Sequence, residues 1–329
     1  MRIGILGAGH IAGKVSQTLK QMSEVRCYAV AARERWRAAA FAGEHGFAKA
    51  YGSYEALVSD PDVELVYVAT PHSYHYPHVK LALEHGKHVL CEKSFMLNAR
   101  EAEALTALAR TKGLLLAEAI WTRYMPFSKT IKEVIGSGVI GTPRILSANL
   151  GYPVDWKERL VKPELGGGAL LDLGVYCLNF ALMYFGSDIA DIRTACVKHA
   201  SGVDMQETIA LYYRDGRVAN LHATAWCATD RQGVIGGDNG FLVVDNINNP
   251  MSATAWDRYG TQLGHWQAPP RISGFEYEFL ACRDAILQGR CEPEDMPHSE
   301  TLTVMRLMDA LRAEWGVRFP GDTVQCRQA

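Results

Sequence analysis

The chain begins with a short apolar strand that runs directly into a glycine-rich turn, in the sequence MRIGILGAGHIAGK. The strand is predicted over residues 3–6, and the segment GAGHIA (7–12) precedes a helical pattern. In a G-x-G-x-x-A turn, Gly7 permits a tight bend, Gly9 lets the backbone approach a pyrophosphate, and the small Ala12 lets the helix pack on the strand. The helix N-terminus adds unpaired N–H groups for the phosphates. This arrangement predicts a bound dinucleotide, with an ordinary glycine-rich turn as the alternative.

Length and composition indicate two domains and argue against a nucleic-acid-binding protein. The 329 residues are enough for two hydrophobic cores, and 48% hydrophobic with 21% charged residues is ordinary for a globular chain. A formal net charge of −2 offers no positive surface for nucleic acid or an anionic membrane. No apolar run reaches the roughly 18 residues that span a bilayer. The early first strand leaves no room for a signal peptide.

Eight cysteines are scattered along the chain, at positions 27, 91, 177, 196, 227, 282, 291 and 326. They form no C-x-x-C pair, which argues against both a zinc site and a disulfide framework. We therefore expect reduced thiols and a cytoplasmic location. No spacing of His, Cys, Asp and Glu suggests a metal site either.

The first 120 residues alternate between strand and helix patterns. Strands are predicted at 25–32, 65–70, 88–91 and 114–118, and helices at 35–45, 51–57, 76–85 and 99–111. Alternation of this kind produces a parallel sheet with right-handed crossovers. Residues 1–120 are thus predicted to form an α/β nucleotide-binding domain, with the doubly wound parallel sheet of the Rossmann fold.

The pattern changes after residue 120. Strands are predicted at 144–150, 207–213, 217–226 and 240–244, and helices at 127–137, 274–288 and 299–315. Asp215-Gly216 between two of these strands is a strong hairpin signal. Residues 121–329 are therefore predicted to form an α+β substrate domain with a large open, mainly antiparallel sheet. We expect the last helix to pack back on the first domain.

Four further segments are informative in the order in which they follow the glycine-rich turn: ATPHSYH (69–75), CEKS (91–94), EAIWTR (118–123) and GGGALLDLGVY (166–176). Together with the opening turn, they resemble the Gfo/Idh/MocA oxidoreductases over nearly the whole chain. EAIWTR and the tyrosine at 176 are most similar to the dimeric dihydrodiol dehydrogenases, which also oxidise aldoses such as D-xylose with NADP. The resemblance implies an NADP-dependent oxidoreductase acting on a sugar, a cyclic diol or a related secondary alcohol or carbonyl.

Three residues of these segments are candidates for catalysis. Lys93 follows strand 88–91, at the carboxyl end of the sheet where ligands bind. Asp172 and Tyr176 are four residues apart and would share one face of a helix. Oxidising an alcohol by hydride transfer needs a base, and the reference pKa of tyrosine, near 10, is high for that purpose. We expect the Lys93 ammonium to lower the pKa of Tyr176, and Asp172 to orient the lysine or the substrate hydroxyl.

The resemblance also implies contacts to the cofactor beyond the glycine turn, from His10, Ile11, Thr70, Pro71, His75, Glu92, Lys93, Trp121 and Arg123. For His75, a place at the surface entry of a helix explains the residue equally well. One departure from the family stands at Ser94, where proline is usual. Without proline the backbone at Lys93 is less restricted, while the ammonium itself remains.

The choice of cofactor is read at the end of the second strand, in AARER (31–35). Enzymes that use NAD place an acid there for the ribose 2′-hydroxyl, whereas enzymes that use NADP place small residues and arginine. Arg33 follows two alanines and favours binding of the 2′-phosphate of NADP, and Arg35 or Arg37 is a candidate for a second contact to it. Glu34 is the contrary sign, although an acid also suits the start of a helix. NADP is therefore predicted in preference to NAD.

Two other functions are alternatives to an oxidoreductase with net turnover. An NAD(P)-assisted glycosidase or lyase oxidises C3 of a sugar only transiently, so it gives no net absorbance change at 340 nm. A nucleotide-sensing protein would bind the nucleotide without converting any substrate.

The outer face of strands 207–213 and 217–226 is predicted to form a homodimer interface, because one face of a wide sheet needs to be covered by something other than water.

Overall fold

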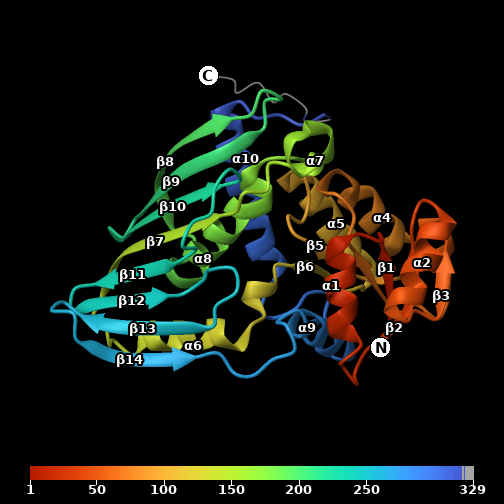
Figure 1. Cartoon of the computed structure of the whole chain (residues 1–329), viewed down its shortest axis with the longest axis horizontal. Helices are drawn as coiled ribbons and strands as arrows, with labels where there is room; N and C mark the ends of the chain where they lie inside the picture. Colours follow the sequence, from red (N-terminus) through yellow and green to blue (C-terminus); the bar gives the residue numbers. More distant parts are fainter. Residues whose placement is uncertain (321, 323–329) are drawn as a thin grey trace.

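The computed structural model describes residues 1–320 and 322, which form two sheets beside each other (Figure 1). The first sheet occupies one end of the molecule, and the second, larger sheet occupies the other end. Helices lie on both faces of the first sheet and on one face of the second. The α/β architecture with two unlike sheets agrees with the predicted fold class.

The first sheet has six parallel strands in the order β3-β2-β1-β4-β5-β6. Its strands are β1 (Arg2–Leu6), β2 (Arg26–Ala31), β3 (Lys49–Tyr51), β4 (Leu65–Val68), β5 (His88–Glu92) and β6 (Leu116–Ala119). The order reverses between β1 and β4, and a doubly wound sheet binds its ligand in the crevice at such a point. The interior strand β4, with the sequence LVYV, is apolar and buried throughout, because helices cover both faces of the sheet.

Five helices connect these strands: α1 (His10–Leu19), α2 (Arg35–His45), α3 (Tyr54–Val58), α4 (His75–Glu84) and α5 (Ala99–Lys112). Local signals set their ends. The Asn98 side chain caps α5 by accepting a hydrogen bond from the Glu101 N–H at 3.0 Å. Gly113 ends α5 in the left-handed region, at φ 64°. The predicted helix 51–57 is wrong at its start, since Tyr51 closes β3 and the helix begins only at Tyr54.

The second sheet has eight strands in the order β14-β13-β12-β11-β7-β10-β9-β8. They are β7 (Pro143–Gly151), β8 (Ile189–Lys198), β9 (Asp204–Tyr213), β10 (Val218–Thr224), β11 (Gly233–Gly237), β12 (Gly240–Val244), β13 (Ser252–Asp257) and β14 (Gln262–Gln267). Every neighbouring pair is antiparallel except β7 and β10. Asp215-Gly216 turns β9 into β10, as its hairpin signal indicates.

Sequence patterns missed β8, β11, β13 and β14. β11 reads GVIGG, and its glycines leave no alternation to recognise. Its backbone must pass close to other groups, because a Cβ at Gly233 would lie 2.3 Å from the Phe180 ring. β8 and β14 are the edge strands of the sheet, and their side chains are mostly exposed or half-buried. Edge strands carry weak hydrophobic patterns because little of their surface is covered.

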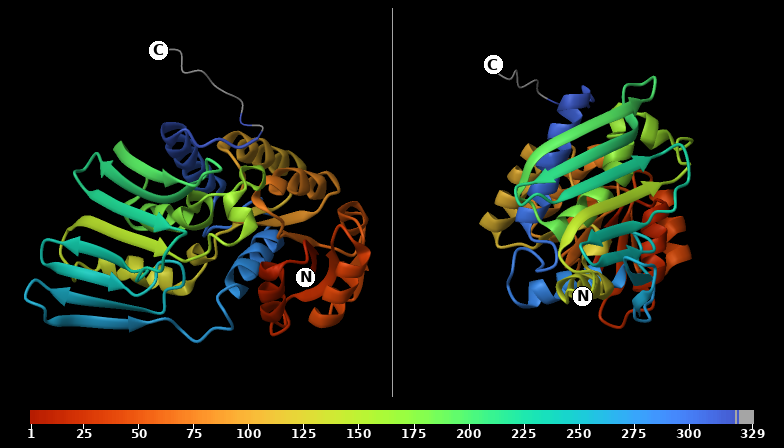
Figure 2. Two further views of the ribbon diagram at one scale, coloured as in Figure 1. Left: turned by 45° about the horizontal axis from the view of Figure 1, so that its top comes forward. Right: turned by 90° about the vertical axis from the view of Figure 1, so that its left-hand side faces the viewer.

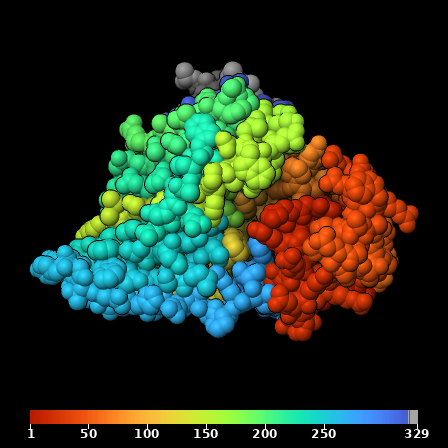
Figure 3. Space-filling model, viewed as in Figure 1, coloured from red at the N-terminus to blue at the C-terminus, as the bar shows by residue number. Residues whose placement is uncertain are grey.

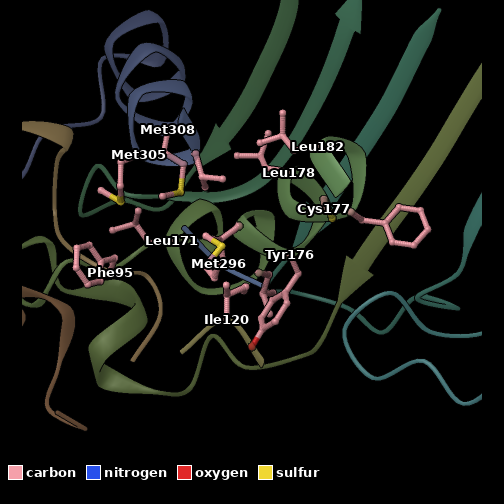
Figure 4. Packing of buried hydrophobic residues seen from close by; sticks show 14 of the residues in the cluster. Phe95, Ile120, Leu171, Tyr176, Cys177, Leu178, Leu182, Met296, Met305 and Met308 are labelled. Atoms are coloured by element: carbon pink, nitrogen blue, oxygen red, sulfur yellow. The ribbon is translucent and has the colours of Figure 1, made fainter. Parts of the chain in front are cut away.

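The helices of the second half are α6 (Pro126–Gly136), α7 (Glu158–Val161), α8 (Val175–Phe185), α9 (Glu276–Leu287) and α10 (His298–Trp315). Helix α8 packs on β7 and β10, and Tyr176, Leu178 and Leu182 project from it into the core with Met305 and Met308 of α10 (Figure 4). Within the part of the chain that the structure describes, no helix lies over the opposite face of the sheet, as the right-hand view of Figure 2 shows.

One helical stretch, Pro163–Phe185, has the length and mean hydropathy of a membrane span, 23 residues at 1.5. It is not an unbroken apolar run, because Glu164 and Asp172 interrupt it. The reason for its apolar character is packing, because 89% of its apolar window is buried inside the protein. A helix that is hydrophobic all round is typical of a protein core as well as of a membrane.

Two late helices return to the first sheet. Arg312 on α10 donates to the Leu97 carbonyl at 2.9 Å, and Asp309 accepts from the Ala99 N–H at 2.8 Å, so α10 packs beside α5. Helix α9 does the same on another side of the sheet, where Phe279 and Cys282 join the core of β1, β2 and β4. The packing of α9 on the first sheet was not predicted from the sequence. The pattern of apolar residues along a helix shows which face is buried, but not which sheet it packs against.

Candidate active site

Two adjoining cavities lie along the carboxyl ends of β1, β4 and β5. Their volumes are about 330 Å³ and about 910 Å³. Both are lined by Gly9, Ala69, Thr70, Pro71 and Leu165, so together they form one continuous trough. The space-filling view shows a hollow in this region, between the N-terminal segment and the second half of the chain (Figure 3). The trough lies at the point where the strand order of the first sheet reverses.

The glycine turn forms the floor of the trough. Gly7 has φ +104°, and a Cβ there would lie 2.8 Å from the Ala69 carbonyl oxygen, so only glycine fits. Gly9 precedes α1, and a Cβ on it would meet no atom within 4 Å, so the trough has open space above this residue. Ala12 is fully buried and packs in the core, which is the packing role expected of it.

The smaller cavity holds the charged residues that follow β2. Arg33, Glu34 and Arg37 all line it, whereas Arg35 does not. Tyr54 also lines it. Burial raises the pKa of the Tyr54 phenol, while the charges of Arg33 and Arg37 oppose the increase. Arg33 and Arg37 thus place two positive charges at this end of the trough, beside the carboxyl of Glu34. Tyr74 and His78 complete the wall, their rings stacked at 5.8 Å.

The larger cavity holds the three candidate catalytic residues. Lys93 donates from Nζ to the Asp172 backbone oxygen at 2.6 Å and to Asp172 Oδ1 at 3.0 Å. Asp172 also accepts two hydrogen bonds from Arg159, NH1 to Oδ1 at 3.0 Å and NH2 to Oδ2 at 3.1 Å. Burial opposes ionisation of Asp172, but the charges of Lys93 and Arg159 outweigh it and hold the pKa of the carboxyl well below its usual range.

Tyr176 lies beside this ion cluster rather than in it. Lys93 Nζ is 5.1 Å from the centre of the Tyr176 ring. Burial, followed by the carboxyls of Glu92 and Asp172, raises the pKa of Tyr176 well above 10. The expected lowering by Lys93 is therefore wrong for the protein without ligands, because burial of the phenol, together with the neighbouring carboxyls, raises its pKa. Figure 4 shows the phenol oxygen pointing away from Met305 and Met308.

The helix that carries Asp172 and Tyr176 is not a uniform α-helix. Leu170–Gly174 forms a π-helical turn, and α8 starts at Val175. A wider turn of this kind is frequent at functional sites. Both side chains nevertheless line the same cavity, so the predicted common face is retained. The Lys93–Ser94 peptide bond is cis, and the Ser94 hydroxyl donates to the Leu171 carbonyl at 2.8 Å.

Other predicted cofactor contacts lie along the trough. The larger cavity is lined by His10, Ile11, Thr70, Pro71, Glu92 and Trp121. Glu92 is buried at the end of β5, where its carboxylate accepts hydrogen bonds from the Tyr67 hydroxyl and the Lys93 N–H. Burial raises the pKa of Glu92. Trp121 stacks on Phe275 with ring centres 4.5 Å apart.

Two predicted cofactor contacts point elsewhere. His75 is fully buried, with Nδ1 2.9 Å from the Ser94 carbonyl oxygen and Nε2 2.8 Å from that of Thr70. Its ring thus connects the loop after β4 to the loop after β5, and it lines neither cavity. Because His75 is buried, the alternative of a helix entry at the surface is wrong as well. Arg123 is also buried away from the trough. It donates to Asn179 of α8 at 2.6 Å and to Glu300 of α10 at 3.0 Å.

Several lining residues were missed by sequence reasoning. Trp156, Lys157 and Arg159 come from the segment after β7, Asn248 from the loop after β12, and Phe275 from the start of α9. None belongs to a recognisable motif. The cationic pair K-x-R at 157–159, shortly before the GGG segment, was the only available signal. Across residues 1–320 and 322, no group of three His, Cys, Asp or Glu side chains could hold a metal ion.

The trough fits a nicotinamide dinucleotide. It offers a glycine floor, the N–H groups that begin α1 and two arginines at its far end. It then continues past Thr70 and Pro71 to Lys93 and Tyr176. When bound, such a cofactor supplies hydride transfer to or from its nicotinamide ring. The charged and aromatic groups of the larger cavity would surround that ring and the reacting carbon.

Comparison with known proteins assigns the family. Residues 1–119 match the family model described as "Oxidoreductase family, NAD-binding Rossmann fold", and residues 128–243 match the "GFO/IDH/MocA C-terminal domain". The chain belongs to the Gfo/Idh/MocA oxidoreductase family. Its relatives include the trans-1,2-dihydrobenzene-1,2-diol dehydrogenase of Mus musculus, 34% identical over 98% of this chain and 99% of the relative. The Homo sapiens enzyme of that name is 33% identical over the same shares.

Two solved structures of oxidoreductases have the same architecture. KijD10, a 3-ketoreductase from Actinomadura kijaniata solved in complex with NADP and TDP-benzene, gives a TM-score of 0.86 at 27% identity, over 97% of this chain and 99% of its own. An aldose-aldose oxidoreductase from Caulobacter crescentus, complexed with glycerol, gives 0.86 at 23% identity over 95% and 96%, which shows the fold alone. This Gfo/Idh/MocA protein is thus an oxidoreductase of the NAD(P)-dependent dehydrogenase or reductase class.

Proposed function

We propose that this protein is an NADP-dependent oxidoreductase that transfers a hydride between the nicotinamide and a sugar, a cyclic diol or a related secondary alcohol or carbonyl. One observation supports the proposal above others. Lys93, Asp172 and Tyr176 line one cavity, directly beside the trough that fits a dinucleotide. The dihydrodiol dehydrogenases and the 3-ketoreductase similar to this chain support the same substrate classes.

Tyr176 is proposed to hold the proton that the substrate oxygen loses or gains. Its phenol is protonated near neutral pH, because burial raises its pKa, so it is ready to act as an acid when a carbonyl is reduced. Oxidation needs the phenolate form. A substrate oxygen that hydrogen-bonds both Lys93 and Tyr176 would weaken the hold of Asp172 on the ammonium and direct that charge to the phenol. Asp172 positions Lys93, and Arg159 positions Asp172.

NADP is proposed in preference to NAD on the composition of the smaller cavity. Arg33 and Arg37 both line it, and a 2′-phosphate would receive charge-assisted hydrogen bonds from them. Glu34 lines the same cavity and is the residue that would favour NAD. Two arginines against one glutamate leave a positive balance at the end where the extra phosphate would lie.

The domain division and the assembly are proposals of the same kind. We propose residues 1–120 as the NAD(P)-binding domain and 121–329 as the substrate-binding and dimerisation domain.

A homodimer through the outer face of the second sheet is supported by its exposed apolar side chains, among them Ile145, Tyr212 and Phe241. A cytoplasmic location is supported by the described cysteines, which form no disulfide.

The experiment is a panel of aldoses, polyols and cyclic diols, each assayed with NADP and with NAD by absorbance at 340 nm. We expect net NADPH formation with at least one panel member, and a higher kcat/KM with NADP than with NAD. A protein that cleaves a glycoside without net change at 340 nm would be the NAD(P)-assisted glycosidase or lyase instead. Tight nucleotide binding without turnover on any panel member would indicate a nucleotide-sensing protein.

A further inference from the structure

The charges that line the larger cavity do not balance. Its lining carries four cationic side chains, from Lys14, Lys93, Lys157 and Arg159, against the carboxyls of Glu92 and Asp172. Asp172 is shared by Lys93 and Arg159. The Glu92 carboxyl accepts its hydrogen bonds from the Tyr67 hydroxyl and the Lys93 backbone N–H rather than from a cationic side chain. The cavity therefore holds more positive charge than its carboxylates neutralise.

Lys157 is one of the cations of this cavity that no described carboxylate pairs with. Among residues 1–320 and 322, its ammonium makes no ion pair or hydrogen bond, and its neighbour is the Trp156 ring, centred 5.5 Å away. Burial and then repulsion by Arg159 lower the pKa of Lys157, against an opposing effect of the Asp172 carboxylate. A cation in such a place is stabilised when an anion binds beside it.

Position assigns Lys157 to the substrate end of the trough. Lys157 lines the larger cavity from the same segment as Arg159, whose guanidinium binds Asp172, whereas Lys14 lies on α1 beside the glycine turn. The smaller cavity, with Arg33 and Arg37, is lined by no residue of the segment 156–159. Lys14 is thus placed for the cofactor phosphates, and Lys157 for whatever occupies the space in front of Lys93 and Tyr176.

We propose that Lys157 forms an anion-binding subsite, so that the preferred substrate is a sugar or polyol that carries a carboxylate or a phosphate. The proposal rests on the function proposed above and adds the charge of the substrate. Arg159 does not compete for this anion, because its guanidinium is occupied at two points by Asp172. Trp156, 76% exposed beside the lysine, offers an apolar face to the carbon side of a sugar ring.

The test compares anionic and neutral forms of one sugar. With NADP, kcat/KM is measured for D-glucuronate, D-glucose 6-phosphate and D-glucose on wild type, Lys157→Met and Lys157→Arg. A charge-assisted hydrogen bond contributes about 1.5–3 kcal/mol, so we expect an anion-to-neutral ratio of roughly 10 to 100 in wild type. That ratio should fall at least about 10-fold in Lys157→Met and largely recover in Lys157→Arg. The two anionic arms distinguish a carboxylate subsite from a phosphate subsite.

Lys162→Met is the matched control. Lys162 follows in the same segment, is paired with Glu158 and lines neither cavity, so its loss should leave the ratio unchanged. Equal ratios for wild type and Lys157→Met overturn the subsite. A rise in the KM for NADP in Lys157→Met, with an unchanged sugar ratio, also overturns it, because the lysine then serves the cofactor phosphates.

Binding separates this inference from the proposed function. Calorimetric titration of the NADP-loaded protein with D-glucuronate and with D-glucose needs no turnover. Glucuronate binding that depends on Lys157, without oxidation of any sugar, supports the subsite and contradicts the proposed oxidoreductase substrate class. Oxidation of neutral sugars without preference for their acids leaves the proposed function standing and removes the subsite.

Discussion

Arg159 and Asp172 form a two-point ion pair, with distances of 3.0 Å and 3.1 Å between their nitrogen and oxygen atoms. The same carboxylate holds the Lys93 ammonium at 3.0 Å. Asp172 therefore joins a lysine from the first sheet to an arginine from the segment after β7. Arg159, which no motif identifies, therefore binds the same carboxylate that binds Lys93.

Replacing Arg159 tests the role of this shared carboxylate. In Arg159→Met, Asp172 loses one of the two cations that hold its pKa low, so the pKa of Asp172 should rise. The acid limb of the kcat profile should then move to higher pH, and kcat at neutral pH should fall on the order of 10-fold. Arg159→Lys should recover only part of the loss, because an ammonium cannot make the two-point contact. An unchanged acid limb would show that Arg159 contributes to packing alone.

Tyr176→Phe removes the phenol oxygen and little else. We expect turnover to fall on the order of 10²-fold or more, while the fold and the affinity for NADP are retained. Tyr184→Phe on the same helix is the control, since Tyr184 lines neither cavity. Wild-type turnover in Tyr176→Phe would assign the proton transfer to another group. His75 is a poor substitute, because both of its ring nitrogens face backbone carbonyls in the core.

The ionisation of Tyr176 can be measured separately. Burial raises its pKa well above 10, so the protein without cofactor should form no Tyr176 phenolate at neutral pH. The difference in phenolate absorbance between wild type and Tyr176→Phe, followed from pH 7 to pH 11, isolates this group from the other tyrosines. A phenolate component that titrates below pH 9 would show that Lys93 acts on the phenol despite its contact with Asp172.

Arg33→Ala should raise the KM for NADP much more than the KM for NAD. Only NADP carries the 2′-phosphate, and a charge-assisted contact contributes roughly 1.5–3 kcal/mol, or about 10- to 100-fold. Arg37→Ala should act in the same direction. Arg35→Ala is the control, because Arg35 does not line the cavity. Equal changes for both cofactors in Arg33→Ala would argue against the phosphate contact.

Glu118 should make stability depend on pH. It is 2% exposed, and burial is the main cause that raises its pKa from 4.5 to about 7, against the opposing effects of Thr301 and Arg123. A carboxyl with a raised folded-state pKa stabilises the protein fully below pH 4.5, and this contribution is lost as the pH rises through 7. At 1.36 kcal/mol per pKa unit the loss is about 3 kcal/mol.

Chemical denaturation of wild type and Glu118→Gln between pH 4 and pH 8 measures this contribution. The free energy of unfolding of wild type relative to the variant should decrease across that interval, because glutamine does not titrate. The comparison is needed because burial also raises the pKa of Glu92, Asp204, Glu207 and Glu278, so wild type alone reports several groups. Parallel curves for the two proteins would show that Glu118 does not titrate in this range.

The assembly is tested by light scattering at micromolar protein. The chain has a mass of 36.3 kDa, and we expect about twice that value. Ile145→Asp places a charge on the uncovered face of the second sheet, where Ile145 is 46% exposed, and should shift the mass to that of the monomer. Leu287→Asp on α9, 70% exposed and away from that sheet, should leave the mass unchanged. A wild-type mass near 36 kDa would contradict the dimer.

The sequence by itself determined the nucleotide-binding end of the protein. Gly7, Gly9 and Ala12 act within one strand, turn and helix, so their roles follow from a dozen consecutive residues. The predicted bounds of α2, 35–45, agree with the structure, and its stop at Gly46 is equally local. Arg33 is determined in the same way, because it follows β2 directly and so reaches the end of the trough. Lys93, Asp172 and Tyr176 could likewise be selected as catalytic candidates from the sequence, because each lies in a segment that carries the family resemblance.

Only the tertiary structure decided which side of each loop faces the trough. His75 and Arg123 follow strands of the first sheet as cavity residues do, yet both turn to the core, because the backbone carbonyls and side chains that bind them come from distant segments. Lys157 and Arg159 turn toward the cavity from a segment without a motif. The pKa of Tyr176 was also decided there, since burial of the phenol and the carboxyls of Glu92 and Asp172, which come from separate elements, raise it. Contacts of this range depend on how separate elements pack, which no local pattern records.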